Sequence, residues 1–229
     1  MFFAPLCAAI IGGVFAAVVL RQYGARRKPY QACWGGALAL FAVAAALEAF
    51  ASISGWTPFT YKVYYLFGAI LNVGWLGVGS LYILSSRWGR LGAVLMGVIT
   101  IAAIPVVAVS PTDHVLLLAT VPGRGAIGNP APIFPLVTNI AGSILLIGGA
   151  ARSAWVDLRR RAPWGRVTGL SLIAAGAFLV AITHTLAQTR GVYLIEPLGE
   201  AFGIVVMFAG YLAVEAQRIP LLDRRPVAQ

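Results

Sequence analysis

The chain has 229 residues, of which 60% are hydrophobic and only 10% are charged, with a net charge of +10 at pH 7. Because a soluble domain carries about 25% charged residues, we expect the surplus apolar surface to face lipid, so a water-soluble protein is excluded. The basic residues form short clusters between long apolar runs and do not interleave with aromatic residues, which argues against nucleic acid as a partner.

Seven apolar segments of near-spanning length follow one another along the chain. A helix needs about 20 apolar residues to cross the hydrocarbon core of a bilayer. No basic residue precedes the first segment and Arg21 follows it, so this segment reads as a retained helix and not as a signal peptide. We therefore predict an all-α, polytopic domain over residues 1–219 and a short tail over 220–229. The predicted transmembrane helices are 2–20, 32–53, 63–85, 91–109, 131–152, 166–187 and 195–216.

The basic residues also predict the orientation of the bundle. Fourteen of the 17 Lys and Arg residues fall in the turns after the first, third and fifth segments or in the tail; Lys62, Arg124 and Arg190 fall on the other side. Since Lys and Arg accumulate on the cytoplasmic side, we predict the amino terminus outside and the carboxyl terminus in the cytoplasm. The richness in Ala, Gly, Val and Arg fits a multi-pass protein of a bacterial cell membrane.

The longest predicted connection, residues 110–130, lies outside on this orientation. Its Pro and Gly residues mark it as a loop. Its apolar middle, "HVLLLATV", leaves two interpretations open: a segment lying on the membrane surface, or a lid over the mouth of the bundle.

The first three and the last three segments resemble two copies in the same orientation. The linkers "ARRKPYQACWGG" and "LRRRAPWGRVTGL" each place a basic cluster before a proline and an aromatic residue, and Glu48 precedes Gly55 by seven residues as His184 precedes Gly191. This pattern predicts a 3+1+3 internal repeat with the fourth segment as the linker. The alternative is that short apolar helices resemble one another through composition alone.

Seven helices with an outer amino terminus and a 3+1+3 repeat resemble the SWEET sugar transporters and the microbial rhodopsins, in topology and without a diagnostic motif. Asn72 followed by Trp75 is similar to the polar and aromatic pocket of the SWEET family. Segments 32–53, 63–85 and 166–187 lack proline, so the proline-hinged rocking of that family is not expected. A rhodopsin needs a lysine in the last helix, and because the only lysines are Lys28 and Lys62, retinal is excluded.

Polar and ionisable side chains inside predicted spans are rare and costly, so each is a candidate functional residue. They fall at a common depth in the outer half of five different segments, and an aromatic pair shares the helical face of one of them. We predict that they form one polar, aromatic-lined pocket that opens to the outside and binds a small molecule. The predicted ligand-binding residues are Glu48, Tyr65, Asn72, Trp75, Asn139, His184 and Glu200.

Simpler interpretations of the same residues remain open. Glu48 and Glu196 are close enough to the interface to be solvated, whereas Glu200 lies one turn deeper on the face of Glu196. His184 is equally suited to a hydrogen bond between helices. Asn72 and Asn139 could only hold helices together, for about 1–2 kcal/mol each or less.

No metal, cofactor or catalytic residue is predicted. His184, Glu48 and Glu200 lack the spacing of a metal-binding motif, and the sequence shows no nucleophile–base pair and no Gly-rich phosphate loop. We therefore predict a protein that is not an enzyme and that binds or carries a small solute, although an apolar inner half counts against a carrier. Two alternatives remain: a sensor or receptor acting through a separate partner, and a homo-oligomer or scaffold subunit of a membrane complex, with Gly165/Gly169 and Gly199/Gly203 as its contact stripes.

Overall fold

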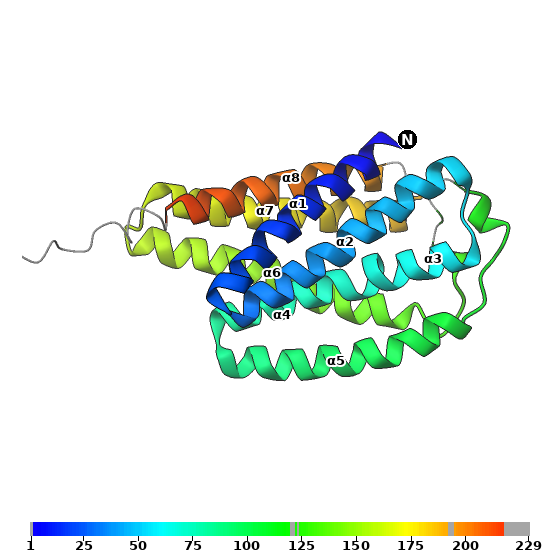
Figure 1. The fold of residues 1–229 in the computed structure, drawn as a ribbon, viewed down its shortest axis with the longest axis horizontal. Coiled ribbons are helices and arrows are strands. Elements are labelled where there is room, and N and C mark those ends of the chain that lie inside the picture. The colour runs from blue at the N-terminus through cyan, green and yellow to red at the C-terminus, as the bar shows by residue number, and fades with distance from the viewer. Residues whose placement is uncertain (1, 120–121, 123, 192–194, 218–229) are drawn as a thin grey trace, which may run out of the picture.

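The computed structural model describes residues 2–119, 122, 124–191 and 195–217 (Figure 1). Within these residues the fold is all-helical, with one isolated bridge between Thr112 and Ile127, and seven helical spans are long and apolar enough to cross a membrane. The prediction of seven apolar helices is therefore confirmed. The predicted tail, 220–229, lies outside the described residues.

The seven spans begin and end close to the predicted bounds. Several continue through their basic ends: the first runs to Arg26 and the fifth to Arg159, where the predictions stopped at residues 20 and 152. A hydropathy pattern stops at the first charged residue, whereas long basic side chains reach water while their helix continues. The spans are α1 (Phe3–Arg26), α2 (Pro29–Ser54), a third span made of α3 (Pro58–Tyr64), η1 (Tyr65–Asn72) and α4 (Val73–Leu84), then α5 (Ser86–Val109), α6 (Ile133–Arg159), α7 (Trp164–Arg190) and α8 (Ile195–Ala216).

The third span is not a uniform α-helix. It begins with a capping box, in which the Thr57 hydroxyl accepts from the Thr60 amide and the Thr60 hydroxyl accepts from the Thr57 amide, followed by Pro58. Its middle, η1, is a π-helix, in which each amide bonds to the carbonyl five residues back. A π-turn contains more residues than an α-turn, so the side chains beyond it point in directions that an α-helical pattern does not predict.

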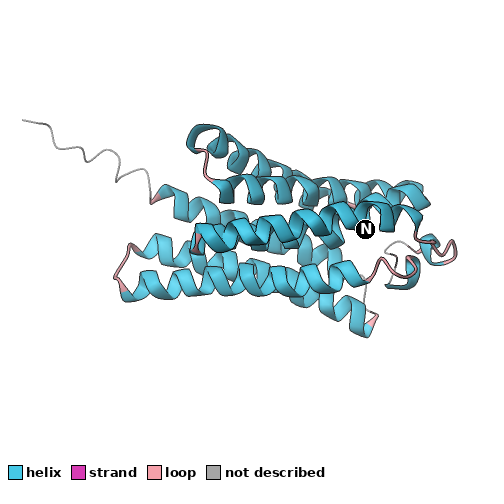
Figure 2. Cartoon of the chain, turned by 90° about the horizontal axis from the view of Figure 1, so that it is seen from below, coloured by secondary structure: helices cyan, strands magenta, loops and turns pink. Residues whose placement is uncertain are grey.

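Six of the spans form a closed ring. Neighbouring spans pack in the order α1, α2, third span, α6, α7 and α8, and α8 packs back against α1. The helices run roughly along the long axis of the bundle (Figures 1 and 2). α1 and α8 close the helix ring through aromatic contacts. The phenyl group of Phe15 in α1 packs against the aromatic groups of Phe208 and Tyr211 in α8, with centroid distances of 4.9 and 5.1 Å. The remaining helix, α5, packs outside the ring against the third span, at the lower edge of Figure 1.

This order is the one that a 3+1+3 duplication requires. A two-fold rotation that exchanges α1 with α6, α2 with α7 and the third span with α8 turns each neighbour pair of the ring into another neighbour pair. The helix left over is α5, the predicted linker. The duplication itself stays a prediction, because neighbour order does not by itself demonstrate common ancestry.

Glycines bring α7 and α8 into backbone contact. A Cβ added to Gly176 would lie 2.6 Å from the carbonyl oxygen of Gly203, and one added to Gly169 would lie 2.6 Å from that of Gly210. Gly165 faces the side chain of Gln217, directly after α8, and Gly199 faces that of Thr183 in α7. The glycine stripes proposed as an outward contact face are therefore used inside the chain, where small residues allow close helix packing.

The connection between α5 and α6 is partly folded onto the bundle. It contains two 3₁₀ turns, η2 (Leu116–Leu118) and η3 (Arg124–Ala126), and Leu117 and Ile127 are buried against the apolar cluster that includes Val107. Val115 and Leu118 are exposed. Residues 120–121 and 123 lie outside the described residues, so the predicted role of this loop as a lid is not tested.

Candidate ligand-binding site

A cavity of about 360 Å³ lies inside the helix ring. It is lined by α2, the third span, α6, α7 and α8, and most of its wall is apolar. Small-molecule sites are typically apolar clefts of roughly 300–1,000 Å³ with a few convergent polar groups. The cavity is at the lower end of that size range, which suits a small organic molecule.

Four of the seven residues predicted to bind a ligand line this cavity. Asn72 comes from the third span, Asn139 from α6, His184 from α7 and Glu200 from α8. The helix ring brings together side chains that are up to 128 residues apart in sequence, from Asn72 to Glu200. Their role in binding stays a prediction, but their convergence on one cavity is a feature of the fold.

Glu48 is buried near the cavity but is not part of its wall. It is 3% exposed and does not line the cavity, but it is close enough to Glu196 and Glu200 to interact electrostatically with both. The interpretation that Glu48 is solvated at the interface does not fit this burial. Its carboxyl group therefore belongs to the electrostatic environment of the cavity.

Tyr65 and Trp75 are not on the cavity wall, contrary to the predicted placement. The wall is formed by Tyr64, Gly68 and Leu76, together with Asn72. The prediction assumed α-helical periodicity on both sides of Asn72. η1 breaks that periodicity between Tyr65 and Asn72, whereas Trp75 lies beyond η1 in α4, where Leu76 lines the wall in its place. Tyr65 and Trp75 instead pack among the partly buried side chains around the apolar clusters.

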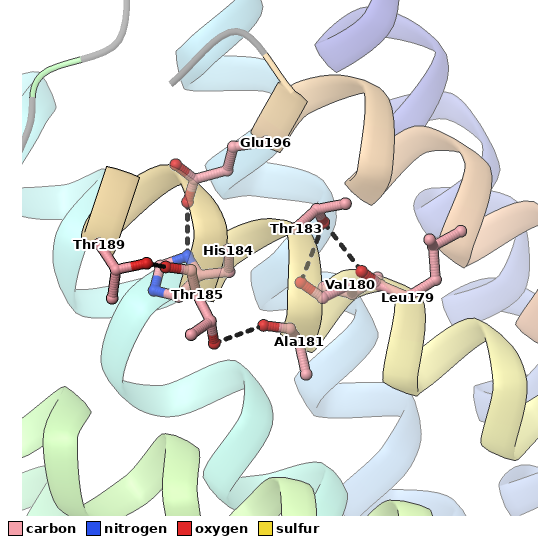
Figure 3. A network of polar contacts seen from close by, with 8 residues as sticks. All are labelled: Leu179, Val180, Ala181, Thr183, His184, Thr185, Thr189 and Glu196. Atoms are coloured by element: carbon pink, nitrogen blue, oxygen red, sulfur yellow. Dashed lines mark hydrogen bonds and ion pairs between the residues drawn. The ribbon is translucent and has the colours of Figure 1, made fainter. Parts of the chain in front are cut away.

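Glu196 was left out of the predicted site, and it is the residue that His184 contacts. His184 Nδ1 and Glu196 Oε1 are 2.5 Å apart (Figure 3). Glu196 is 4% exposed, so the alternative in which it is solvated at the interface is wrong. The signal in the sequence was its four-residue spacing from Glu200, which places both carboxyl groups on one face of α8.

The threonines around His184 satisfy their hydroxyl hydrogens within α7. Thr185 donates to the Ala181 carbonyl at 2.8 Å, and Thr183 donates to the carbonyls of Leu179 and Val180 (Figure 3). Such back-bonding occupies the donor of each hydroxyl. The imidazole of His184 instead makes a polar contact across to Glu196 of α8.

Three buried oxygens around the cavity lack a hydrogen-bond partner among the described residues. They are Oδ1 of Asn72, Oδ1 of Asn139 and Oε2 of Glu196, and all three residues line the cavity. A buried polar atom without a partner costs about 1–3 kcal/mol, so in native proteins such atoms normally bond to the protein, to ordered water or to a ligand. All three atoms are acceptors and would be satisfied by donors on a molecule in the cavity.

The end of the cavity that bears His184 is rich in carboxyl groups. Glu48, Glu196 and Glu200 lie near one another, with His184 as the basic group in contact. Among the described residues, the ion pairs made by arginine are Arg26–Glu215 and Arg166–Asp157, so none of the three glutamates pairs with an arginine or lysine. Within the same residues, no group of three His, Cys, Asp or Glu side chains has the geometry to hold a metal ion.

Comparison with models of protein families, with curated proteins and with solved structures finds no match to this chain. The function is therefore inferred from the helix ring, the cavity and the side chains around it.

Proposed function

We propose that this chain is a multi-pass membrane protein that binds a small solute in the cavity of its helix ring. The observation that carries the proposal is the set of three unpartnered acceptor oxygens on residues that line one cavity. The seven apolar spans support a location in a membrane. The distribution of basic residues favours an orientation in which the end bearing His184 and Glu196 faces outward.

Contacts at one end of the helix ring bear on whether the protein carries its solute or only binds it. Towards the other end of the ring, the Tyr211 hydroxyl donates to Gln22 Oε1 at 2.6 Å and the Gln31 amide donates to the same oxygen at 3.3 Å, which joins α8, α1 and α2. Arg26 and Glu215 add an ion pair between α1 and α8. A carrier would have to open these contacts to release the solute at this end, whereas a receptor that signals through a partner would not. These contacts therefore favour a receptor as the second candidate function.

Filling the cavity tests the proposal. Ser143 lines the cavity on α6, whereas Ala141 is exposed on the same helix and does not line it. Ser143→Trp should therefore occupy the cavity, and Ala141→Trp should place an equal volume outside it. Thermal unfolding of both variants and the native protein in lipid nanodiscs would be followed with glucose, leucine, 2-phenylethylamine, 2-phenylethanol and phenylacetate.

We expect at least one of these solutes to raise the unfolding temperature of the native protein and of Ala141→Trp but not of Ser143→Trp. Ligands that bind only the folded state stabilise it in proportion to the logarithm of their concentration over Kd. Equal shifts in all three proteins, or no shift in any, would contradict solute binding in this cavity. Uptake of the same solute into liposomes would then distinguish a carrier from a receptor.

A further inference from the structure

We infer that the solute is a small organic cation, an amine with an apolar body, whose ammonium group lies among the carboxyl groups at the outer end of the cavity. This inference rests on the proposed function and names the chemical class of its ligand. It follows from three independent features of the site: its charge, its hydrogen-bonding groups and its apolar wall.

The charge of the site favours a cation. Three carboxyl groups, on Glu48, Glu196 and Glu200, lie near one another, with one imidazole in contact with Glu196, and none of them is in an ion pair with arginine or lysine among the described residues. The amine of Lys62 donates instead to the Ala108 carbonyl at 2.7 Å. Since an unpaired charge away from water is costly, these carboxyl groups need a proton or a cation, and an anionic ligand would add to the repulsion.

The buried atoms of the site that lack a partner favour a donor on the ligand. The unpartnered buried atoms of Asn72, Asn139 and Glu196 are all acceptor oxygens. An ammonium group has donors and no acceptor, so it matches these atoms without leaving a polar atom of its own unsatisfied. A sugar carries an acceptor with every hydroxyl donor, and part of these groups would face the apolar wall.

Glu196 is positioned by a bond that leaves one oxygen unused. Its Oε1 is held by His184 at 2.5 Å, and its Oε2 is buried without a partner in the described part of the chain. Glu196 is 4% exposed and lines the cavity with Glu200, one helical turn further along α8. Buried and fixed in this way, the carboxyl group is part of a preformed site and not of a solvated surface patch.

The rest of the cavity favours an apolar body on the ligand. Phe41, Leu76 and Ile147 line it together with Ile204 and Met207 of α8. Tyr64 also lines the cavity and is close enough to Glu48, Glu196 and Glu200 to interact with all three. An aromatic ring beside the carboxyl groups adds an attraction for a cation, because the face of the ring is negative.

Three probes of similar size test the preference of the site for a positive charge. The probes are 2-phenylethylamine, 2-phenylethanol and phenylacetate, which share an aromatic body and differ in the charge of the polar end. Calorimetric titration of the native protein in nanodiscs should show the amine binding at least about tenfold more tightly than the alcohol, and phenylacetate more weakly than both, because like charges repel in a low-dielectric site. This comparison needs no variant.

Glu200→Gln tests the charge directly. Among the described residues Glu200 makes no ion pair, so an isosteric amide is not expected to break a contact that holds the fold. The variant should weaken the amine at least about tenfold and leave the alcohol unchanged, as expected for the loss of a charge interaction shielded from water. Asp113→Asn is the matched control, since it removes a carboxylate of the same charge from the exposed loop and should change neither affinity.

The outcomes separate the two proposals. If the alcohol binds as tightly as the amine and Glu200→Gln changes neither, the cation inference is overturned while solute binding in the cavity stands. Failure of the amine to bind also overturns the inference. If Ser143→Trp leaves amine binding intact, the solute is bound elsewhere and the proposed function itself fails.

Discussion

His184 and Glu196 join the end of α7 to the start of α8, with Nδ1 and Oε1 2.5 Å apart. The side chain of Glu196 is 5% exposed and that of His184 is 37% exposed, so the contact joins a buried carboxyl group to a partly exposed imidazole. It fixes one carboxyl oxygen and leaves the other directed to the site, and it links two helices that belong to the same proposed repeat.

Removing His184 should cost more stability than neutralising Glu196. His184→Ala leaves the buried carboxyl group of Glu196 without its partner, at a cost of about 1–3 kcal/mol, whereas Glu196→Gln keeps an acceptor for the ring nitrogen and should cost less than about 1 kcal/mol. The free energy of unfolding in mixed micelles would measure both. The loss of unfolding free energy in the double variant should be smaller than the sum of the two single losses by more than about 0.5 kcal/mol. Strict additivity would show that the pair does not interact.

Gly176→Ala should destabilise the contact between α7 and α8. Its new Cβ would meet the Gly203 carbonyl oxygen at 2.6 Å, so the helices must separate, at a cost of about 1–3 kcal/mol. Gly148→Ala on α6 is the control, because no atom lies within 4 Å of its Cβ position and alanine should stabilise the helix by about 0.5–1 kcal/mol. Equal unfolding free energies for the two variants would contradict the close packing.

Asn72→Leu should not destabilise the empty protein. The Asn72 carbonyl oxygen is buried without a partner, so an apolar side chain of similar shape removes a cost of about 1–3 kcal/mol. By contrast, Tyr211→Phe removes a satisfied bond to Gln22 and should cost about 0.5–1.5 kcal/mol. Thermal unfolding without added solute compares the two, and a loss of stability in Asn72→Leu would indicate that its amide holds helices together.

The carboxyl terminus should lie in the cytoplasm. The bias of fourteen basic residues against three predicts that a fluorescent protein fused after Gln229 is fluorescent and that alkaline phosphatase fused there is inactive. The opposite pair of results would invert the bundle. The cavity end with His184 would then face inward, and the test solutes would have to be supplied from the cytoplasmic side.

The proposed repeat predicts the outcome of a superposition. In an experimentally determined structure, α1, α2 and the third span should overlay on α6, α7 and α8 by rotation about an axis normal to the membrane. Glu48 and His184 should then fall at equivalent depth. A best overlay that pairs the helices in a different order would remove the duplication, although the ring and its cavity would be unaffected.

The seven spans could be predicted because lipid imposes a length and a composition on each of them. The convergence of Asn72, Asn139, His184 and Glu200 could be anticipated from their common depth, since costly polar groups in hydrocarbon tend to meet one another or water. Depth does not determine direction, however. Which of these side chains face inward depends on how each helix is rotated in the ring, and that follows from packing across the whole bundle.

The residues that were misplaced show where local pattern fails. Tyr65 and Trp75 were assigned to the face of Asn72 by α-helical periodicity. The π-helix puts Tyr64 on the wall in place of Tyr65, and in α4, beyond the π-helix, Leu76 lines the wall in place of Trp75. No signal for a π-helix is evident in "YLFGAILN". Glu196 was set aside because it falls near a helix end, yet the contact with His184 buries it there.

The closed ring has a consequence for how the protein is made. α1 completes the ring only by packing against α8, which is synthesised after every other helix of the ring. Until α8 enters the bilayer, the side of α1 that carries Phe15 is exposed to lipid and His184 lacks its partner. The last helix inserted thus brings both acidic residues of the cavity wall, so the acidic end of the cavity is completed only in a late step of membrane insertion.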